Sequence, residues 1–131
     1  HVLEHVHQLH DYVKKFEELL KKDGKLFIAV PPYTSADAKM YGRFWAASDV
    51  PSHLYHFSPK AMGNLLNAHG LKLEKIKPMW YDSVYVSMLS ENYKTGKAHP
   101  ARAFINGMAS NLSALFNKTK CISIIYIASK K

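Results

Sequence analysis

The first five residues carry side chains with the types and spacing of a metal site. His1, Glu4 and His5 form the pattern H-x-x-E-H, in which two histidines one helical turn apart bind zinc and the glutamate acts on water. The pattern has only three fixed positions, and a zinc peptidase needs a further metal ligand later in the chain. Glu74 and Glu91 are available, but no supporting pattern surrounds either. A zinc peptidase is therefore a minor alternative, and our leading hypothesis places no metal here.

A second concentration of histidine and aromatic side chains lies in residues 33–57, which show no clear periodicity. Long irregular segments inside compact domains are often functional. Packing of the aromatic rings into the core and bracing of the loop by the histidines would explain the same composition. The candidates in and beside this segment are Tyr33, Tyr41, Trp45, His53, Tyr55 and His56.

Composition limits the class of protein. A chain of 131 residues with 47% apolar content is enough for one packed domain. The net charge of +8 comes from lysines spread over every segment, so we expect no nucleic-acid partner. No apolar run approaches the roughly 20 residues of a membrane span, and no signal peptide is present. The single cysteine, Cys121, lies in an apolar run, which favours a buried thiol and a reducing cytoplasm.

Hydrophobic periodicity predicts alternating helices and strands in the first half of the chain. We expect a helix over residues 6–22, ended by Gly24 in a left-handed turn. The apolar run 25–30, closed by two prolines, is typical of a strand that is buried on both faces. The segment 58–70 opens with a Ser-Pro pair and closes with glycine, which predicts a helix between those signals.

The second half continues the same order. A strand is expected over residues 71–76, with a bulge near residues 74–75 where its alternation slips. Asp82 is a plausible N-cap for a short helix, and Pro100 opens a longer one. The final run, 122–128, is almost continuously apolar and predicts a central strand. These elements indicate the α/β class. The apolar side expected for the longer helix consists of Phe104, Ile105, Met108, Leu112, Leu115 and Phe116.

The order of several short motifs resembles a known family. The chain begins His-Val-Leu-Glu-His-Val and, after the predicted helix, reads Lys-Lys-Asp-Gly-Lys-Leu-Phe-Ile-Ala-Val-Pro-Pro; later it reads Asp-Val-Pro-Ser-His-Leu-Tyr-His-Phe-Ser. These segments resemble the class I S-adenosylmethionine-dependent methyltransferases of types 11 and 23, in the subgroup similar to quinone-biosynthesis enzymes. The resemblance covers most of residues 1–90.

The resemblance implies a particular arrangement of strands. The three predicted strands would be strands five, six and seven of a Rossmann-like methyltransferase fold, in a mixed sheet of order 5-7-6 with the last strand antiparallel. The family's glycine-rich cofactor turn is missing among the six glycines. Residues 1–131 would therefore form a single domain that is the C-terminal part of a methyltransferase. The N-terminal half would be its partner, and this chain alone would be inactive. The free edge of strand 25–30 would favour a homodimer.

The resemblance also implies roles for individual residues. The cofactor would be S-adenosylmethionine, with its methionine side beside His1, Val2, Leu3, Glu4 and His5, although the apolar members could simply pack the helix entry. In the acceptor pocket, His53 or His56 would be the general base, and Tyr33, Tyr41, Trp45 and Tyr55 would form a wall for a small or apolar acceptor. The competing hypothesis is a catalytically inert α/β module for binding or oligomerisation.

Overall fold

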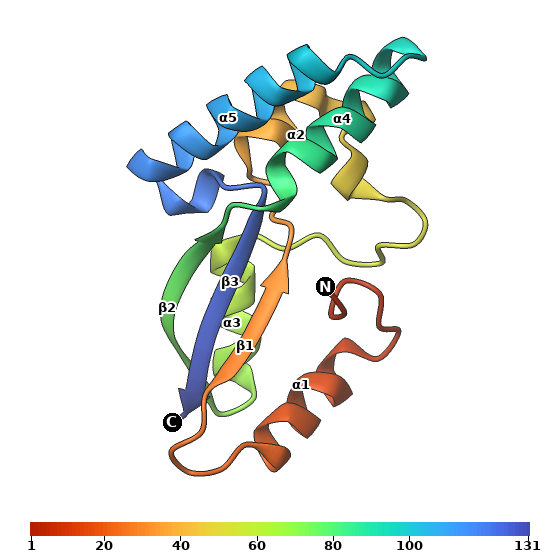
Figure 1. Ribbon diagram of the computed structural model, residues 1–131. Helices are drawn as coiled ribbons and strands as arrows, with labels where there is room; N and C mark the ends of the chain where they lie inside the picture. Colours follow the sequence, from red (N-terminus) through yellow and green to blue (C-terminus); the bar gives the residue numbers. More distant parts are fainter.

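The computed structural model describes residues 1–131 as a mixed α/β fold (Figure 1). Its helices are α1 (Leu9–Leu19), α2 (Ala36–Tyr41), α3 (Pro59–Ala68), α4 (Asp82–Thr95) and α5 (Pro100–Phe116). Its strands are β1 (Leu26–Val30), β2 (Leu71–Met79) and β3 (Ser123–Lys130). Three single 3-10 turns, η1 (Gly42–Phe44), η2 (Ala46–Ser48) and η3 (Lys118–Lys120), complete the order. None of the helices is long and apolar enough to cross a membrane.

The three strands form one sheet with the order β1-β3-β2. Both pairings are antiparallel, so β1 and β2 run in the same direction and β3 lies between them in the opposite direction. This is the order expected from the sequence, with the last strand inserted between the other two. The expected bulge is also present, because the β2–β3 register shifts between Leu73 and Lys75.

One face of the sheet carries the main hydrophobic core. Met62 and Leu66 of α3 and Val13 of α1 are fully buried in the same cluster as Ile124 and Tyr126 of β3. Helix α3 lies behind the sheet, and α1 lies beside β1 (Figure 1). Burial of these apolar side chains stabilises the small sheet.

The opposite face of the sheet is more open, and this corrects one expectation. We expected the strand at 25–30 to be buried on both faces, but Phe27 is 65% exposed. Its cross-strand partner Ile127 and the neighbouring Ile125 are only half-buried. The strand is apolar on both faces, but the described residues cover only one of them.

The predicted start and stop residues are confirmed for α3, whereas those predicted for α1 are wrong. Ser58 accepts a hydrogen bond from the Ala61 amide and caps α3, as predicted, and Gly70, which was expected to end this helix, adopts φ +72°. Helix α1, in contrast, spans only Leu9–Leu19 of the expected 6–22 and ends five residues before Gly24. Gly24 is not left-handed, so that prediction is wrong.

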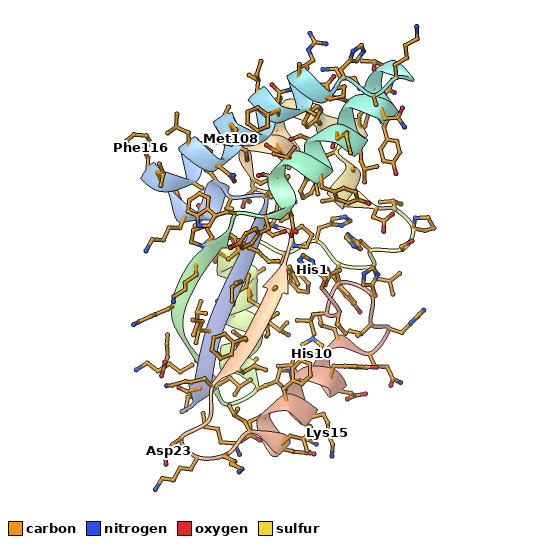
Figure 2. All side chains as sticks on the ribbon, in the orientation of Figure 1. His1, His10, Lys15, Asp23, Met108 and Phe116 are labelled. Atoms are coloured by element: carbon orange, nitrogen blue, oxygen red, sulfur yellow. The ribbon has the colours of Figure 1, made fainter.

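Helices α4 and α5 pack as a pair with small residues inside, which corrects a second expectation. Helix α5 buries Ala103, Gly107, Ser110 and Ala114 rather than its large apolar side. A Cβ at Gly107 would lie 3.0 Å from the Val84 backbone, so the helices approach closely there. The expected apolar side projects outward instead, as Figure 2 shows for Met108 and Phe116. The exposed fractions across that side range from 48% at Met108 to 88% at Phe116.

The start and length of α4 also differ from the expectation. Asp82 is the first helical residue rather than the N-cap, which is Tyr81 and makes no capping hydrogen bond with its side chain. The helix has 14 residues, so it is not short. Its buried positions are the small or polar residues Ser83, Ser87, Ser90 and Glu91.

Candidate functional site

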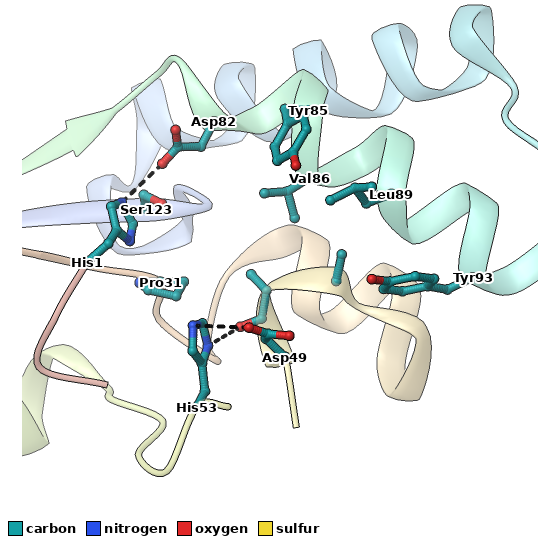
Figure 3. Close-up of a pocket in the computed structure, with 12 residues that line it drawn as sticks. His1, Pro31, Asp49, His53, Asp82, Tyr85, Val86, Leu89, Tyr93 and Ser123 are labelled. Atoms are coloured by element: carbon teal, nitrogen blue, oxygen red, sulfur yellow. Dashed lines mark hydrogen bonds and ion pairs between the residues drawn. The ribbon is translucent and has the colours of Figure 1, made fainter. Parts of the chain in front are cut away.

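A cavity of about 430 Å³ lies where β1 and β2 end and β3 begins. Pro31 follows β1, Asp82 comes shortly after β2, and Ser123 opens β3; all three line it. The carboxyl ends of parallel strands in open α/β sheets are the usual place for a ligand. Figure 3 shows the lining side chains facing this space. The remaining lining residues are His1, Ala46, Ala47, Asp49, His53, Tyr85, Val86, Leu89 and Tyr93.

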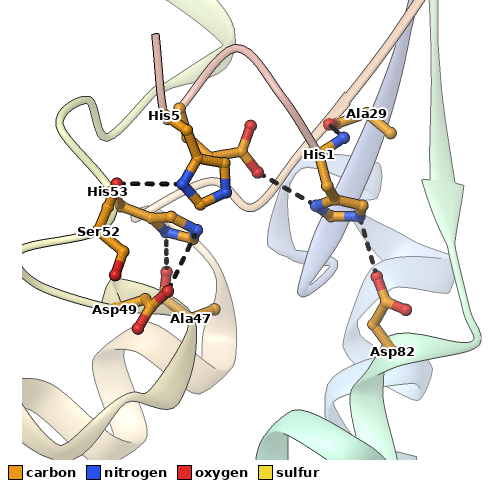
Figure 4. A network of polar contacts seen from close by, with 9 residues as sticks. His1, His5, Ala29, Ala47, Asp49, Ser52, His53 and Asp82 are labelled. Atoms are coloured by element: carbon orange, nitrogen blue, oxygen red, sulfur yellow. Dashed lines mark hydrogen bonds and ion pairs between the residues drawn. The ribbon is translucent and has the colours of Figure 1, made fainter. Parts of the chain in front are cut away.

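His1 holds the N-terminal segment against this cavity. Its backbone nitrogen donates a hydrogen bond to the Ala29 carbonyl at 2.7 Å. Its Nδ1 lies 3.2 Å from Glu4 Oε1, and its Nε2 lies 3.3 Å from Asp82 Oδ2 (Figure 4). The hydrogen bond to Glu4 raises the pKa of His1 against the opposing effect of burial, and Asp82 adds to the rise. Both ring nitrogens therefore face carboxylates, which favours the imidazolium form.

Glu4 is the buried anion of the segment. Its side chain is 1% exposed, and its backbone carbonyl accepts a hydrogen bond from the Leu54 amide at 2.7 Å. Burial alone would raise the pKa of Glu4, but the hydrogen bond and charge of His1 together with a backbone hydrogen bond leave it lowered. The second carboxylate oxygen, Oε2, is buried and has no hydrogen-bond partner. A buried carboxylate oxygen without a partner is costly and calls for a functional explanation.

The structure separates the two candidate bases. His53 donates from Nδ1 to the Ala47 carbonyl at 2.9 Å, and its Nε2 lies 3.9 Å from Asp49 Oδ2 beside the cavity. His56 donates from Nε2 to the Ser48 carbonyl at 2.9 Å and is exposed outside the cavity lining. His53 is therefore the better placed of the two. Both histidines also brace the loop.

The four predicted aromatic residues do not form one wall. Tyr33 and Trp45 line a separate shallow hollow with His56. Tyr41 is 3% exposed, and its hydroxyl donates to Glu91 at 3.2 Å between α2, α4 and α5. Tyr55 donates to the His7 carbonyl at 3.3 Å and braces the N-terminal segment. None of the four lines the cavity that contains His1 and His53.

The remaining N-terminal candidates also lie in different environments. Leu3 is buried in the core cluster, whereas Val2 is 60% exposed. His5 donates from Nδ1 to the Ser52 carbonyl at 3.0 Å. The five candidates thus combine core packing with polar groups near the cavity. The segment is a turn rather than a helix, so His1 and His5 do not share a helical face as H-x-x-E-H requires.

Sequence reasoning missed the contribution of α4 to the cavity. Tyr85, Leu89 and Tyr93 all line it. They recur at intervals of four residues, which places them on one face of a helix. This four-residue spacing could have predicted that the three side chains lie on one face of a helix, although not which neighbour that face meets. Because the sequence suggested only an N-cap role for Asp82, its contact with His1 was not predicted.

The fold and the position of the cavity define a Rossmann-like α/β protein with a cavity at its strand ends. The sequence model of the methyltransferase domain family matches residues 1–76. This is more than half of the chain, and the chain therefore belongs to the methyltransferase domain family. No curated protein matches it. The match includes β1 and α3 and reaches into β2, whereas α4 and α5 lie beyond it.

Proposed function

We propose that the protein containing this chain transfers a methyl group from S-adenosylmethionine to a small or apolar acceptor. One observation carries the proposal. The cavity at the carboxyl ends of β1 and β2 is lined by both His1 and His53, one from the segment assigned to the cofactor and one from the loop assigned to the acceptor. Membership of the methyltransferase family supplies the reaction class.

The residues present fit one part of this cofactor. The sulfonium and amino groups of S-adenosylmethionine are cationic, and the carboxylates of Glu4, Asp49 and Asp82 lie in or beside the cavity. A glycine-rich turn for the adenosine end is not among residues 1–131. We therefore assign only the methionine end to this chain, and the rest to the N-terminal half expected from the family.

The chain's own residues would align the acceptor and take up a proton. Bound S-adenosylmethionine supplies an already activated methyl carbon, so the protein needs alignment and exclusion of water more than covalent chemistry. Val86, Leu89 and the two tyrosine rings of α4 give the cavity apolar walls for an acceptor. His53 would accept the proton if the acceptor atom carries one, because its Nδ1 donates to Ala47 and leaves Nε2 free.

The test compares two histidines in the intact natural protein. Binding of S-adenosylmethionine is measured by calorimetry, and transfer of its labelled methyl group is followed with a panel of small phenols and carboxylic acids. We expect His53→Asn to lower kcat about 100-fold or more, with cofactor binding retained. His56→Asn should leave kcat within about threefold, because this ring lies outside the cavity. Equal losses in both variants would refute the role of His53.

The same experiment separates methyl transfer from the competing hypothesis. If the intact protein binds no S-adenosylmethionine, the proposed function fails and the inert binding or oligomerisation module is favoured. The cytoplasmic location also stays part of the proposal. It is consistent with the buried free thiol of Cys121.

A further inference from the structure

Three metal-ligating side chains converge at the junction between the N-terminal segment and the loop that follows η2. Glu4, His5 and His53 each offer one ligand atom, and these atoms all lie within 4.8 Å of one another. The rings of His5 and His53 meet edge to face, with centroids 4.6 Å apart (Figure 4). Glu4 and His5 are neighbours in the sequence, whereas His53 lies 48 positions after His5. Only the fold therefore brings His53 close to the other two residues.

The surroundings of these groups are those of a prepared metal site. Nδ1 of His5 donates to the Ser52 carbonyl and Nδ1 of His53 donates to the Ala47 carbonyl. This orients both rings and leaves each Nε2 with a free lone pair, as second-shell carbonyls do for metal-bound histidines. Glu4 adds an oxygen that is buried without any partner. A cation would satisfy that oxygen.

We propose that Glu4, His5 and His53 bind one divalent metal ion, and that the ion is zinc. Two imidazole nitrogens and one carboxylate form a common zinc ligand set. Ligand atoms of a tetrahedral zinc site lie roughly 3.4 Å apart, given bond lengths of about 2.0–2.2 Å. Side-chain movements of about 1 Å would therefore close the site. Asp49, 3.9 Å from His53 Nε2, is in reach of the fourth position.

Zinc at this position would fasten the N-terminal segment to the loop of residues 49–56. It would also occupy Nε2 of His53, so the zinc-bound form could not use this atom as the base of methyl transfer, and added zinc should inhibit that reaction. The inference does not depend on that function, because it rests on the geometry of three side chains. Simple ring packing between His5 and His53 is the competing explanation, and it predicts no bound metal.

Zinc content and affinity can be measured on the tag-free chain after treatment with a chelator. Calorimetry with ZnCl2 should give one site per chain, and the thermal unfolding temperature should rise on binding. We expect His53→Gln and His5→Gln each to weaken binding at least tenfold. X-ray absorption at the zinc edge should show two nitrogen ligands from imidazole and at least one oxygen.

The chain offers a matched control in its second histidine pair. His10 and His69 are hydrogen bonded at 2.8 Å in an exposed contact, and neither belongs to the proposed ligand set. His69→Gln should leave zinc binding unchanged. The proposal is overturned if the chain binds no zinc, or if His69→Gln removes the site while His53→Gln leaves it intact.

A second inference comes from the α4–α5 pair and does not involve the metal site. Helix α5 is small and polar on its buried side and apolar on its exposed side, the reverse of a water-soluble amphipathic helix. Its exposed apolar side chains include Phe104, Ile105, Leu112, Leu115 and Phe116. Residues 92–131 contain seven lysines and arginines and no aspartate or glutamate. Four of these basic residues flank α5, on both sides in sequence, and Arg102 in its first turn lies 3.8 Å from the buried carboxylate of Glu91.

We infer that this face of α5 lies on an anionic membrane surface without crossing it. An apolar helix face bordered by basic residues inserts its apolar side at the lipid headgroup boundary, and each basic residue adds about 1 kcal/mol near acidic lipids. Docking of a second copy of this chain would instead bring two positively charged borders together. Charge therefore favours the anionic surface as the occupant.

Vesicle sedimentation separates the possible occupants. The chain should pellet with vesicles of phosphatidylcholine and phosphatidylglycerol but not with phosphatidylcholine alone, and 0.5 M salt should weaken binding. Ile105→Glu with Leu112→Glu should reduce binding at least tenfold; circular dichroism should remain unchanged because both side chains are exposed. Leu19→Glu, on the exposed side of α1, is the control. Absence of pelleting, or a dimer that Ile105→Glu disrupts, would refute the inference.

Discussion

At the scale of single residues, the structure shows polar groups whose burial the sequence did not reveal. Asp37, at the start of α2, is completely buried. Its Oδ2 accepts a hydrogen bond from Ser87 at 3.3 Å, and its Oδ1 has no partner. Burial raises the pKa of Asp37 to about 6, and the hydrogen bond only partly opposes this. Carboxylate side chains are usually exposed. The sequence alone therefore did not predict that Asp37 is buried.

The raised pKa of Asp37 predicts how stability depends on pH. The folded chain holds this proton more tightly than the unfolded chain, so its contribution is complete below about pH 3.8 and is lost as pH rises towards 6. This difference in the pKa of Asp37 between the folded and unfolded chain corresponds to about 3 kcal/mol. We expect Asp37→Asn to raise the free energy of unfolding by up to that amount above pH 6, as measured by urea denaturation. Exposed Asp23→Asn is the control. Equal stability of Asp37→Asn and the natural chain at pH 7 would contradict the prediction.

At the scale of elements, local signals predicted most helices and strands but not which side of each is buried. The caps of α3 and the bulge in β2 follow from short patterns, because neighbouring residues alone determine them. Helix α5 shows the limit of this reasoning. Its large residues form a clear apolar side, yet Gly107 permits a close approach to Val84 on the other side. Only the position of α4 decides between these two packings.

Two helical glycines test this account of packing. An added Cβ at Gly63 in α3 would meet only Leu73 at 3.7 Å, whereas at Gly107 it would press on the α4 backbone at 3.0 Å. Alanine stabilises a helix interior by about 0.5–1 kcal/mol relative to glycine. Gly63→Ala should therefore raise the unfolding temperature, and Gly107→Ala should lower it through overpacking. Thermal unfolding monitored by circular dichroism measures both. An increase for Gly107→Ala would show that the close approach is absent.

At the scale of the whole molecule, the β1 and β2 edges of the sheet and much of one face have no partner. Strand β1 pairs only with β3, and its exposed Phe27 lies on the open face. The family resemblance implies an N-terminal half of the methyltransferase. If that half packed here, it would cover both the edge of β1 and the open face of the sheet. Free strand edges with apolar side chains favour pairing between chains. The domain assignment and the homodimer both stay predictions.

Self-association tests this view of the open sheet. We expect the chain to form dimers at micromolar concentrations in sedimentation experiments. Phe27→Lys should shift it towards the monomer, because a charge on an edge strand opposes pairing. Leu19→Lys, which alters an equally exposed side chain on α1, should not. A chain that remains monomeric over the whole concentration range would contradict the prediction.

The candidate site was only partly predictable, for a physical reason. His1 and His53 were singled out from their segments, and the cavity brings both together. The α4 residues Tyr85 and Tyr93 were not, because the path of that helix depends on its packing against α5. Likewise Tyr41 and Trp45 were expected near the acceptor but are buried elsewhere. Aromatic composition indicates that a segment is apolar and leaves open which neighbour its rings contact.

The sequence by itself determined the α/β class, the strand order and the methyltransferase family, because these follow from local periodicity and from motifs read in order along the chain. Tertiary structure alone decided which side of α5 is buried, which histidine lies at the cavity and which carboxylates lack partners. Those outcomes depend on contacts between residues far apart in sequence. Long-range packing, unlike a helix cap or a bulge, has no local signal.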